Sequence, residues 1–179
     1  MNIFKKISIF LSILISSVLI VAALLPRTYE VTRSIEIKTN STIVFENVAD
    51  YSIYKKWNWL SKQDPMAVIE IKGKLRQKGS SYSWDGRVIG IGSLTLVNVE
   101  PGKMVENTLT YKKPFESIAK DYWTFETTDK GTKVNWVNSG KLSYPMGAFI
   151  VLGINKRLSP QMDSGLVSLK TFSEMKNQN

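Results

Sequence analysis

The residue types that many enzymes use for acid–base and nucleophilic chemistry are missing from this chain of 179 residues, which has no histidine and no cysteine. Histidine-based acid–base catalysis and Ser-His-Asp or Cys-His nucleophile systems are therefore excluded. The histidine and thiolate ligands of zinc and any disulfide framework are excluded as well. Chemistry in this protein would have to use carboxylates, tyrosines, lysines or bound water. We expect no metal site and no cofactor.

Four polar side chains fall on strand positions in phase with apolar, inward-facing neighbours: Arg33, Asn107, Asp121 and Asn138. An inward Arg33 could hold a ligand carboxylate or phosphate, or it could reach solvent at the end of the sheet. We expect Asp121 at a solvated strand entrance; paired with Tyr111, it could instead serve acid–base chemistry. No motif joins these residues into a catalytic set, so we assign no catalytic residue.

Alternating and helical patterns predict the elements that would position these side chains. Residues 29–38 alternate as a strand, and Asn40 and Asp50 are placed to cap two short helices. About six antiparallel strands follow, with hairpin turns at Asp85-Gly86 and at 129–131. Glycines within the strand that follows the first of these turns predict a bend or a bulge.

The C-terminal part of the chain changes to a helical period. Five apolar residues recur every three or four positions: Leu158, Met162, Leu166, Leu169 and Phe172. They predict one face of a long helix, which Pro160 should kink or restart. The apolar stretch 146–154 is too short to span a bilayer. It is either the buried first turns of this helix, a mobile lid, or a membrane-facing lip beside a cavity.

The N-terminal segment is apolar over the length of a membrane-spanning helix. Ile7 to Leu25 contains no charged residue and follows Lys5 and Lys6. As a helix it would span about 28 Å, close to the thickness of the hydrocarbon core of a bilayer. A secretory signal peptide, with Val21-Ala22-Ala23 as its exit, is the alternative. The leucines and proline that follow are a poor cleavage context, which favours an uncleaved anchor.

This anchor divides the chain into two parts. We predict a membrane anchor over residues 1–26 and one domain over 27–179, because no repeat or low-complexity segment interrupts the rest. A short basic tail before a long apolar run usually stays in the cytoplasm. We therefore expect a single-pass protein with residues 27–179 on the extracytoplasmic side.

The chain is basic, with a formal net charge of +9. Its basic residues are scattered, and the cluster from Lys72 to Lys78 is either a solvated strand end and turn or a site attracted to an anionic membrane surface. We expect no nucleic-acid partner, because no recognition motif accompanies the charge.

Three segments carry a resemblance to a known family. Val31–Trp59 resembles a strand and helix that run into a tryptophan-bearing loop, and Tyr122–Trp136 has a W-x-F-E, Gly-turn, V-x-W hairpin. Arg157–Phe172 is similar to the start of a long closing helix with a Gly-Leu-x-x-Leu-Lys step. Together they resemble the SRPBCC (START-like or Bet v 1-like) superfamily, and specifically its bacterial polyketide cyclase/dehydrase type. The resemblance covers 29–175. It implies an α+β helix-grip fold, in which a curved antiparallel sheet wraps around a long C-terminal helix.

The resemblance also implies an apolar cavity between the sheet and the long helix. We expect ten residues to line it or its mouth: Arg33, Trp57, Trp59, Tyr82, Trp84, Asn107, Tyr111, Trp123, Phe125 and Trp136. Ordinary core packing is the alternative for each aromatic residue. Tryptophan and tyrosine join a large apolar body to a polar group, which suits a pocket for an amphipathic ligand.

Three functions are compatible with these features. The first is a membrane-anchored protein that binds a hydrophobic small molecule or lipid without catalysis. The second is a cyclase- or dehydrase-type enzyme, which requires at least two polar groups that converge inside the cavity. The third is a protein-interaction module without a small-molecule ligand, which an open apolar groove without an enclosed pocket would favour. The absence of a transferable catalytic set favours binding over catalysis.

Overall fold

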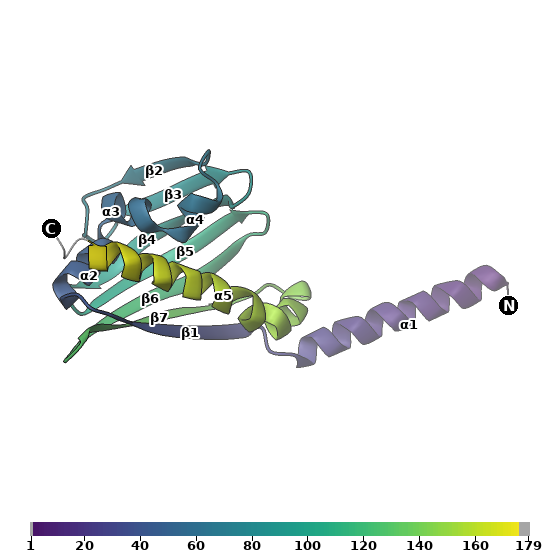
Figure 1. Ribbon diagram of the computed structural model, residues 1–179. Helices are drawn as coiled ribbons and strands as arrows, with labels where there is room; N and C mark the ends of the chain where they lie inside the picture. The colour runs from purple at the N-terminus through teal and green to yellow at the C-terminus, as the bar shows by residue number, and fades with distance from the viewer. Residues whose placement is uncertain (1, 176–179) are drawn as a thin grey trace.

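The computed structural model describes residues 2–175; the end of the predicted domain, 176–179, lies outside the described residues. The chain begins with helix α1 (Ile3–Leu24), which projects away from the rest of the molecule (Figure 1). This helix is long and apolar enough to cross a bilayer, a property that a signal sequence shares. Leu25 and Pro26 end it, and β1 (Thr28–Ile37) starts directly afterwards.

Seven antiparallel strands form one curved sheet in the order β1-β7-β6-β5-β4-β3-β2. The strands after β1 are β2 (Val68–Lys72), β3 (Ser81–Gly86), β4 (Gly90–Glu100), β5 (Met104–Lys113), β6 (Ser117–Thr128) and β7 (Gly131–Lys141). They follow one another as a meander, and β1 pairs with β7 at one edge. The predicted bulge is confirmed, because the register between β4 and β5 shifts after Ile91 and again after Leu96.

Three short helices connect β1 to β2: α2 (Ser41–Ala49), α3 (Tyr51–Trp57) and α4 (Trp59–Gln63). Asn40 and Asp50 cap α2 and α3 as the sequence predicts, each accepting a hydrogen bond from a backbone N–H two residues later. Helix α4 is an addition to the two short helices that the sequence predicts. Asn58 explains the difference, since its side chain accepts from Leu60 N at 3.1 Å and starts a new turn.

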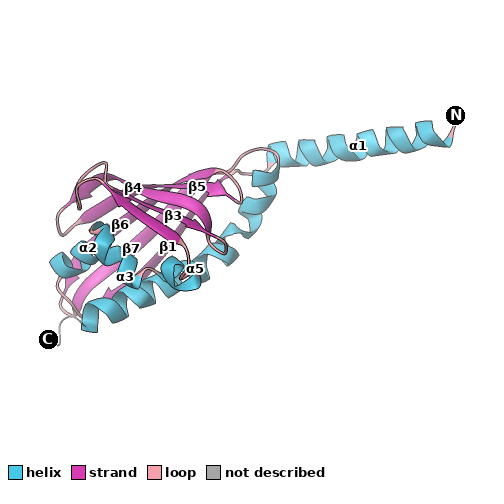
Figure 2. Cartoon of the chain, turned by 90° about the horizontal axis from the view of Figure 1, so that it is seen from above, coloured by secondary structure: helices cyan, strands magenta, loops and turns pink. Residues whose placement is uncertain are grey.

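A single long helix, α5 (Met146–Met175), lies across the face of the sheet that α2 and α3 also cover (Figures 1 and 2). Met162, Leu166 and Leu169 are fully buried against the core, which confirms the predicted apolar face. The helix includes Pro160 and does not restart there, although it changes direction along its length (Figure 2). The molecule is therefore an α+β helix-grip fold preceded by an apolar helix.

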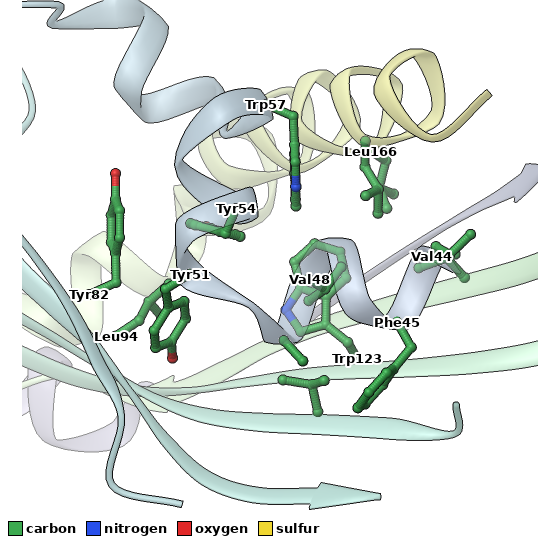
Figure 3. Packing of buried hydrophobic residues seen from close by; sticks show 14 of the residues in the cluster. Val44, Phe45, Val48, Tyr51, Tyr54, Trp57, Tyr82, Leu94, Trp123 and Leu166 are labelled. Carbon is green, nitrogen blue, oxygen red and sulfur yellow. The ribbon is translucent and has the colours of Figure 1, made fainter. Parts of the chain in front are cut away.

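Aromatic side chains dominate the core between the short helices and the sheet. Figure 3 shows Tyr54 and Trp57 of α3 above Trp123 of the sheet. The Trp57 and Trp123 rings meet edge to face, with centroids 6.4 Å apart. Phe45 of α2 meets Phe125 in the same manner at 5.8 Å. Such pairs hold the short helices against one half of the sheet.

Candidate functional site

A cavity of about 70 Å³ lies between the sheet, α3, α4 and α5, and we call it the inner cavity. Its walls are largely aromatic: Tyr54, Trp57, Trp59, Trp84, Tyr111 and Trp136. Polar side chains also reach it, namely Asn58, Asp121, Asn138 and Gln161. A buried water needs roughly 10–15 Å³ of such space, so the inner cavity can hold a compact chemical group but not a large ligand.

Two glycines allow the tryptophan walls to lie where they do. A side chain at Gly92 of β4 would overlap the ring of Trp84, which crosses the strand at this point. A Cβ atom at Gly165 of α5 would lie 2.9 Å from Cζ3 of Trp136. The missing side chain at Gly165 therefore lets α5 approach the sheet over Trp136, whose ring stacks on Trp123 with a centroid separation of 4.2 Å.

A polar network centred on Asp121 lies at the base of the inner cavity. The register places Asn107, Asp121 and Asn138 side by side on β5, β6 and β7. Asp121 Oδ2 accepts from Asn107 Nδ2 at 3.0 Å and from Trp123 Nε1 at 2.7 Å. Its Oδ1 accepts from Trp136 Nε1 at 2.6 Å. The carboxylate thus satisfies indole N–H groups that can only donate.

Two tyrosines extend this network on either side. Tyr51 donates from its hydroxyl to Asn107 Oδ1 at 3.0 Å, and Tyr29 donates to Asn138 Oδ1 at the same distance. The network therefore reaches from α3 through three neighbouring strands to β1. Because every member has partners in the folded protein, the network orients both the carboxylate and the tryptophan rings beside the cavity.

Burial changes the acidity of the groups around the cavity. Asp121 is only 3% exposed, and loss of solvation raises the pKa of its carboxyl above the ordinary value, while hydrogen bonds from Asn107, Trp136 and Trp123 oppose the shift. Burial, with the negative charge of Asp121, raises the pKa of Tyr111 to about 12. Tyr111 is therefore protonated at neutral pH and can donate a hydrogen bond, but it is a poor general base.

Two side chains that line the inner cavity each carry a buried donor without an acceptor. Trp84 Nε1 and Asn58 Nδ2 lie without a hydrogen-bond partner in the part of the chain that the structure describes. An unpaired buried N–H is costly, and most such groups in folded proteins are paired.

A second, larger hollow continues from the inner cavity toward the end of the domain where α1 joins it, and we call it the outer groove. Its volume is about 570 Å³, within the range of small-molecule sites. Five residues line both spaces: Leu109, Tyr111, Asn138, Leu158 and Gln161. Beyond them the walls are mostly apolar and include Phe115, Leu142, Met146, Ile150 and Ile154. The two hollows therefore form one path from a polar interior to an apolar opening.

Half of the ten residues predicted for the cavity line the inner cavity: Trp57, Trp59, Trp84, Tyr111 and Trp136. Tyr82, Trp123 and Phe125 are buried in the core instead, and Asn107 acts through Asp121. Arg33 lies away from both hollows and makes a bidentate pair with Asp163 of α5, with N–O distances of 2.7 and 2.8 Å. β1 is an edge strand next to α5, so Asp163 of this helix binds the Arg33 guanidinium. The sequence predicts a ligand as the partner of this group instead.

The structure also corrects the expectation that Asp121 is solvated, because β5 and β7 flank it with Asn107 and Asn138. The predicted turn at 129–131 sets the register of β6 and β7, so the Asp121–Asn138 pair could have been derived from the sequence. Tyr54 follows from its three-residue spacing to Tyr51 and Trp57 on α3. No local pattern in the sequence predicts that Gln161 and Leu109 line the cavity, because their position relative to it depends on how α5 crosses the sheet.

Among the described residues, Asp121 is the one carboxylate that lines the inner cavity. Among residues 2–175, no group of three or more Asp and Glu side chains lies close enough together to hold a metal ion. Asp121 is instead surrounded by nitrogen donors, which is the environment of a hydrogen-bonded carboxylate and not of a metal ligand.

The fold is widespread among solved structures. A protein from Rhizobium leguminosarum is 13% identical with a TM-score of 0.63, covering 83% of this chain and 95% of that one. SA2116 from Staphylococcus aureus, a protein of unknown function, is 12% identical with a TM-score of 0.63, covering 85% and 97%. The di-domain ARO/CYC protein StfQ of the steffimycin biosynthetic pathway is 11% identical with a TM-score of 0.65, covering 85% of this chain and 52% of that one.

These likenesses show the fold alone, at identities of 11–13%. No curated protein matches the sequence. The family model described as polyketide cyclase/dehydrase and lipid transport matches residues 28–174, which includes all seven strands and nearly all of α5. With the sheet, the closing helix and the cavity between them in place, the chain belongs to the polyketide cyclase/dehydrase and lipid transport family, within the SRPBCC superfamily.

Proposed function

We propose that this protein is a membrane-anchored binding protein for a hydrophobic or amphipathic small molecule. The observation that carries the proposal is the continuity of the small aromatic inner cavity with the large apolar outer groove. A binding site of this kind buries an apolar ligand body and orients it by a few polar groups. The description of the family names both cyclases and lipid transport. Membership of this family therefore supports ligand binding in the space between the sheet and α5.

The polar groups limit the chemistry of the ligand. Tyr111 presents a hydroxyl donor where the two hollows meet, while Asp121 carries a carboxyl group beside the inner cavity. A hydroxyl or carbonyl oxygen would fit the donor, whereas a ligand carboxylate would lose its hydration there without a cationic partner, because no Lys or Arg is among the described residues that line the inner cavity. We therefore place a compact, uncharged oxygen-bearing group in the inner cavity and an apolar chain or ring system in the outer groove.

The membrane part of the proposal depends on α1. Its 22 residues would span about 33 Å, slightly more than the hydrocarbon core of a bilayer. We propose that residues 1–26 remain as a single-pass anchor and that the domain 27–179 lies on the extracytoplasmic side. The ligand would then be taken from, or delivered to, the adjacent bilayer.

The test is direct detection of the ligand in the full chain. Native mass spectrometry of the protein released from nanodiscs should show a bound mass, and solvent extraction should recover an apolar compound with an uncharged oxygen group. Leu158→Trp, which fills the junction of the two hollows, should lower the bound fraction several-fold. Val167→Trp, on an exposed position of the same helix, should not. Wild-type protein with neither bound mass nor uptake of a hydrophobic fluorescent probe would overturn the proposal and leave a protein-interaction role.

An enzyme of the cyclase or dehydrase type is the second candidate. The observation in its favour is that Asp121, Asn138 and Gln161 converge on the inner cavity, which meets the requirement for several polar groups inside it. A carboxyl with a raised pKa can donate a proton to a leaving hydroxyl. Incubation of the extracted ligand with fresh protein, followed by mass spectrometry, should show loss of one water if the enzyme exists. An unchanged ligand mass would leave binding alone.

A further inference from the structure

We propose that the end of the domain next to α1 docks on the bilayer, so that the outer groove opens directly into the lipid layer. The docking surface, which we call the lip, consists of Phe115, Tyr144, Met146, Phe149 and Leu152. This inference rests on the proposed function, because it names the surface through which the ligand reaches the groove. The occupant of the lip is a membrane with anionic headgroups.

The strand order gathers the lip at one end of the sheet. β1 begins beside the end of β7, where Thr28 pairs with Lys141. Because neighbouring strands are antiparallel, the β5–β6 loop with Phe115 and the connection from β7 to α5 lie at this same end. Figure 1 shows the start of α5 beside the C-terminal end of α1. The lip is thus adjacent to the apolar helix.

The contact between α1 and the domain fixes the depth of the lip. The Tyr144 hydroxyl donates to the backbone oxygen of Leu19 at 2.9 Å, and Ala22 is fully buried. Leu19 precedes the end of α1 at Leu24 by about 7.5 Å along the helix axis, at about 1.5 Å per residue. If α1 spans the bilayer, Tyr144 and the start of α5 reach the interface between headgroups and acyl chains. Tyrosine is enriched at that depth.

Exposed apolar side chains occupy the lip and the mouth of the groove together. Phe115 is 77% exposed and Met146 is 65% exposed, and both line the outer groove. Leu152, also 65% exposed, lies two turns into α5. In water these side chains would form an uncovered apolar patch, which marks a membrane or partner surface. Their position at the level of the interface favours the membrane.

Charge at this end complements an anionic membrane. The segments that meet there carry the basic residues Arg27, Arg87, Lys112, Lys113 and Lys141. Asp85 and Glu116 are acidic residues of the same segments, and Asp64, which accepts from Val88 N, is a third acidic residue at this end. Basic residues at the headgroup level are attracted by anionic lipids, and this attraction falls within a Debye length of the surface.

The sequence allows a clean test, because a chain without cysteine accepts one label at one place. Met146→Cys and Leu152→Cys would carry an environment-sensitive fluorophore in the full protein, reconstituted in nanodiscs with or without anionic lipid. Val167→Cys and Met175→Cys, both farther along α5, are matched exposed apolar controls away from the lip. Lipids with a nitroxide near the headgroup should quench the lip labels several-fold more than the control labels, and more strongly with anionic lipid. Equal quenching at all four positions would overturn the inference.

A second measurement separates docking from ligand binding. Phe149→Glu with Leu152→Glu should slow uptake of a fluorescent lipid from the bilayer several-fold, because neither residue lines the groove. Uptake of the same probe from detergent micelles should remain at the wild-type level, and Val167→Glu should change neither. Normal ligand binding with lip labels that are not quenched would overturn the docking proposal alone. Quenched lip labels with no bound ligand in any preparation would overturn the proposed function alone.

Discussion

At the scale of single residues, Asp121 both stabilises the fold and orients side chains that line the inner cavity. Its two oxygens accept hydrogen bonds from an asparagine amide and from the indoles of Trp123 and Trp136. The indoles have no other acceptor in this network, and both rings lie between the sheet and the helices. A carboxylate at this point is therefore a structural requirement as well as a candidate for chemistry.

Asp121→Asn should destabilise the protein by about 1–3 kcal/mol, because an amide nitrogen would then face one of the donors that the carboxylate now satisfies. Asp121→Ala should cost more, since it leaves two indole N–H groups unpaired. Urea unfolding of the full chain in mild detergent, followed by tryptophan fluorescence, measures both. The control is Asp163→Asn, whose exposed pair with Arg33 is worth about 0–1 kcal/mol. Equal losses in the two Asn variants would contradict this account.

The pH dependence of stability follows from the raised pKa of Asp121. The folded state holds the proton more tightly than the unfolded state, whose carboxyl titrates near 3.8. The contribution of Asp121 to stability is therefore fully present below about pH 3.8 and is lost as the pH rises through the raised, folded-state pKa. The free energy of unfolding of the wild type minus that of Asp121→Asn should fall across this window and then level off. A difference that rises with pH would show that the hydrogen bonds outweigh burial.

At the scale of elements, the distance between α5 and the sheet determines the size of the inner cavity. Gly165 sets this distance over Trp136, which cannot move freely because it stacks on Trp123 and donates to Asp121. Gly153 lies on the same helix, and a Cβ atom added there would meet no other atom within 4 Å. The two glycines therefore separate the effect of packing from the effect of helix propensity.

Gly165→Ala should destabilise the protein, because overpacking typically costs about 1–3 kcal/mol and outweighs the gain in helix propensity. Gly153→Ala should instead stabilise it by about 0.5–1 kcal/mol, since alanine orders the helix without a clash. Thermal unfolding in mild detergent compares the two variants with the wild type. If both alanines stabilise, α5 is not in close contact with Trp136.

At the scale of the whole molecule, the position of the apolar helix determines where the cavity can act. Leu25, Pro26 and Arg27 separate α1 from β1, and the backbone oxygen of Arg27 accepts from Leu142 N at 2.8 Å. The domain is thus held at the end of α1 rather than at the end of a long linker. With α1 as the proposed anchor, a ligand would move between the groove and the nearest lipid over a short distance.

An uncleaved anchor makes a clear prediction about the mature protein. Peptide mapping of protein from the membrane fraction should recover the segment with Lys5 and Lys6, and alkaline washing should not release the protein. A membrane-impermeant maleimide should label Val167→Cys from the extracytoplasmic side. A mature N-terminus directly after Ala23 would show instead that the segment is a signal peptide, and labelling only after lysis would reverse the orientation.

The local elements of this protein are determined by its sequence alone. Strand alternation, the caps at Asn40 and Asp50, the turn at 129–131 and the apolar face of α5 depend on neighbours a few positions apart. The apolar character of α1 is equally local. These features, with the resemblance to the SRPBCC superfamily, were sufficient to predict the fold.

The tertiary structure decided which inward side chains reach the ligand space. Arg33 and Trp136 are cross-strand neighbours, yet one pairs with Asp163 and the other lines the inner cavity. The difference arises from the path of α5 across the sheet, which depends on Gly165 and on contacts far apart in the sequence. Burial of Asp121 and the contact of Tyr144 with Leu19 are set in the same way, because both require segments that meet only in the folded chain.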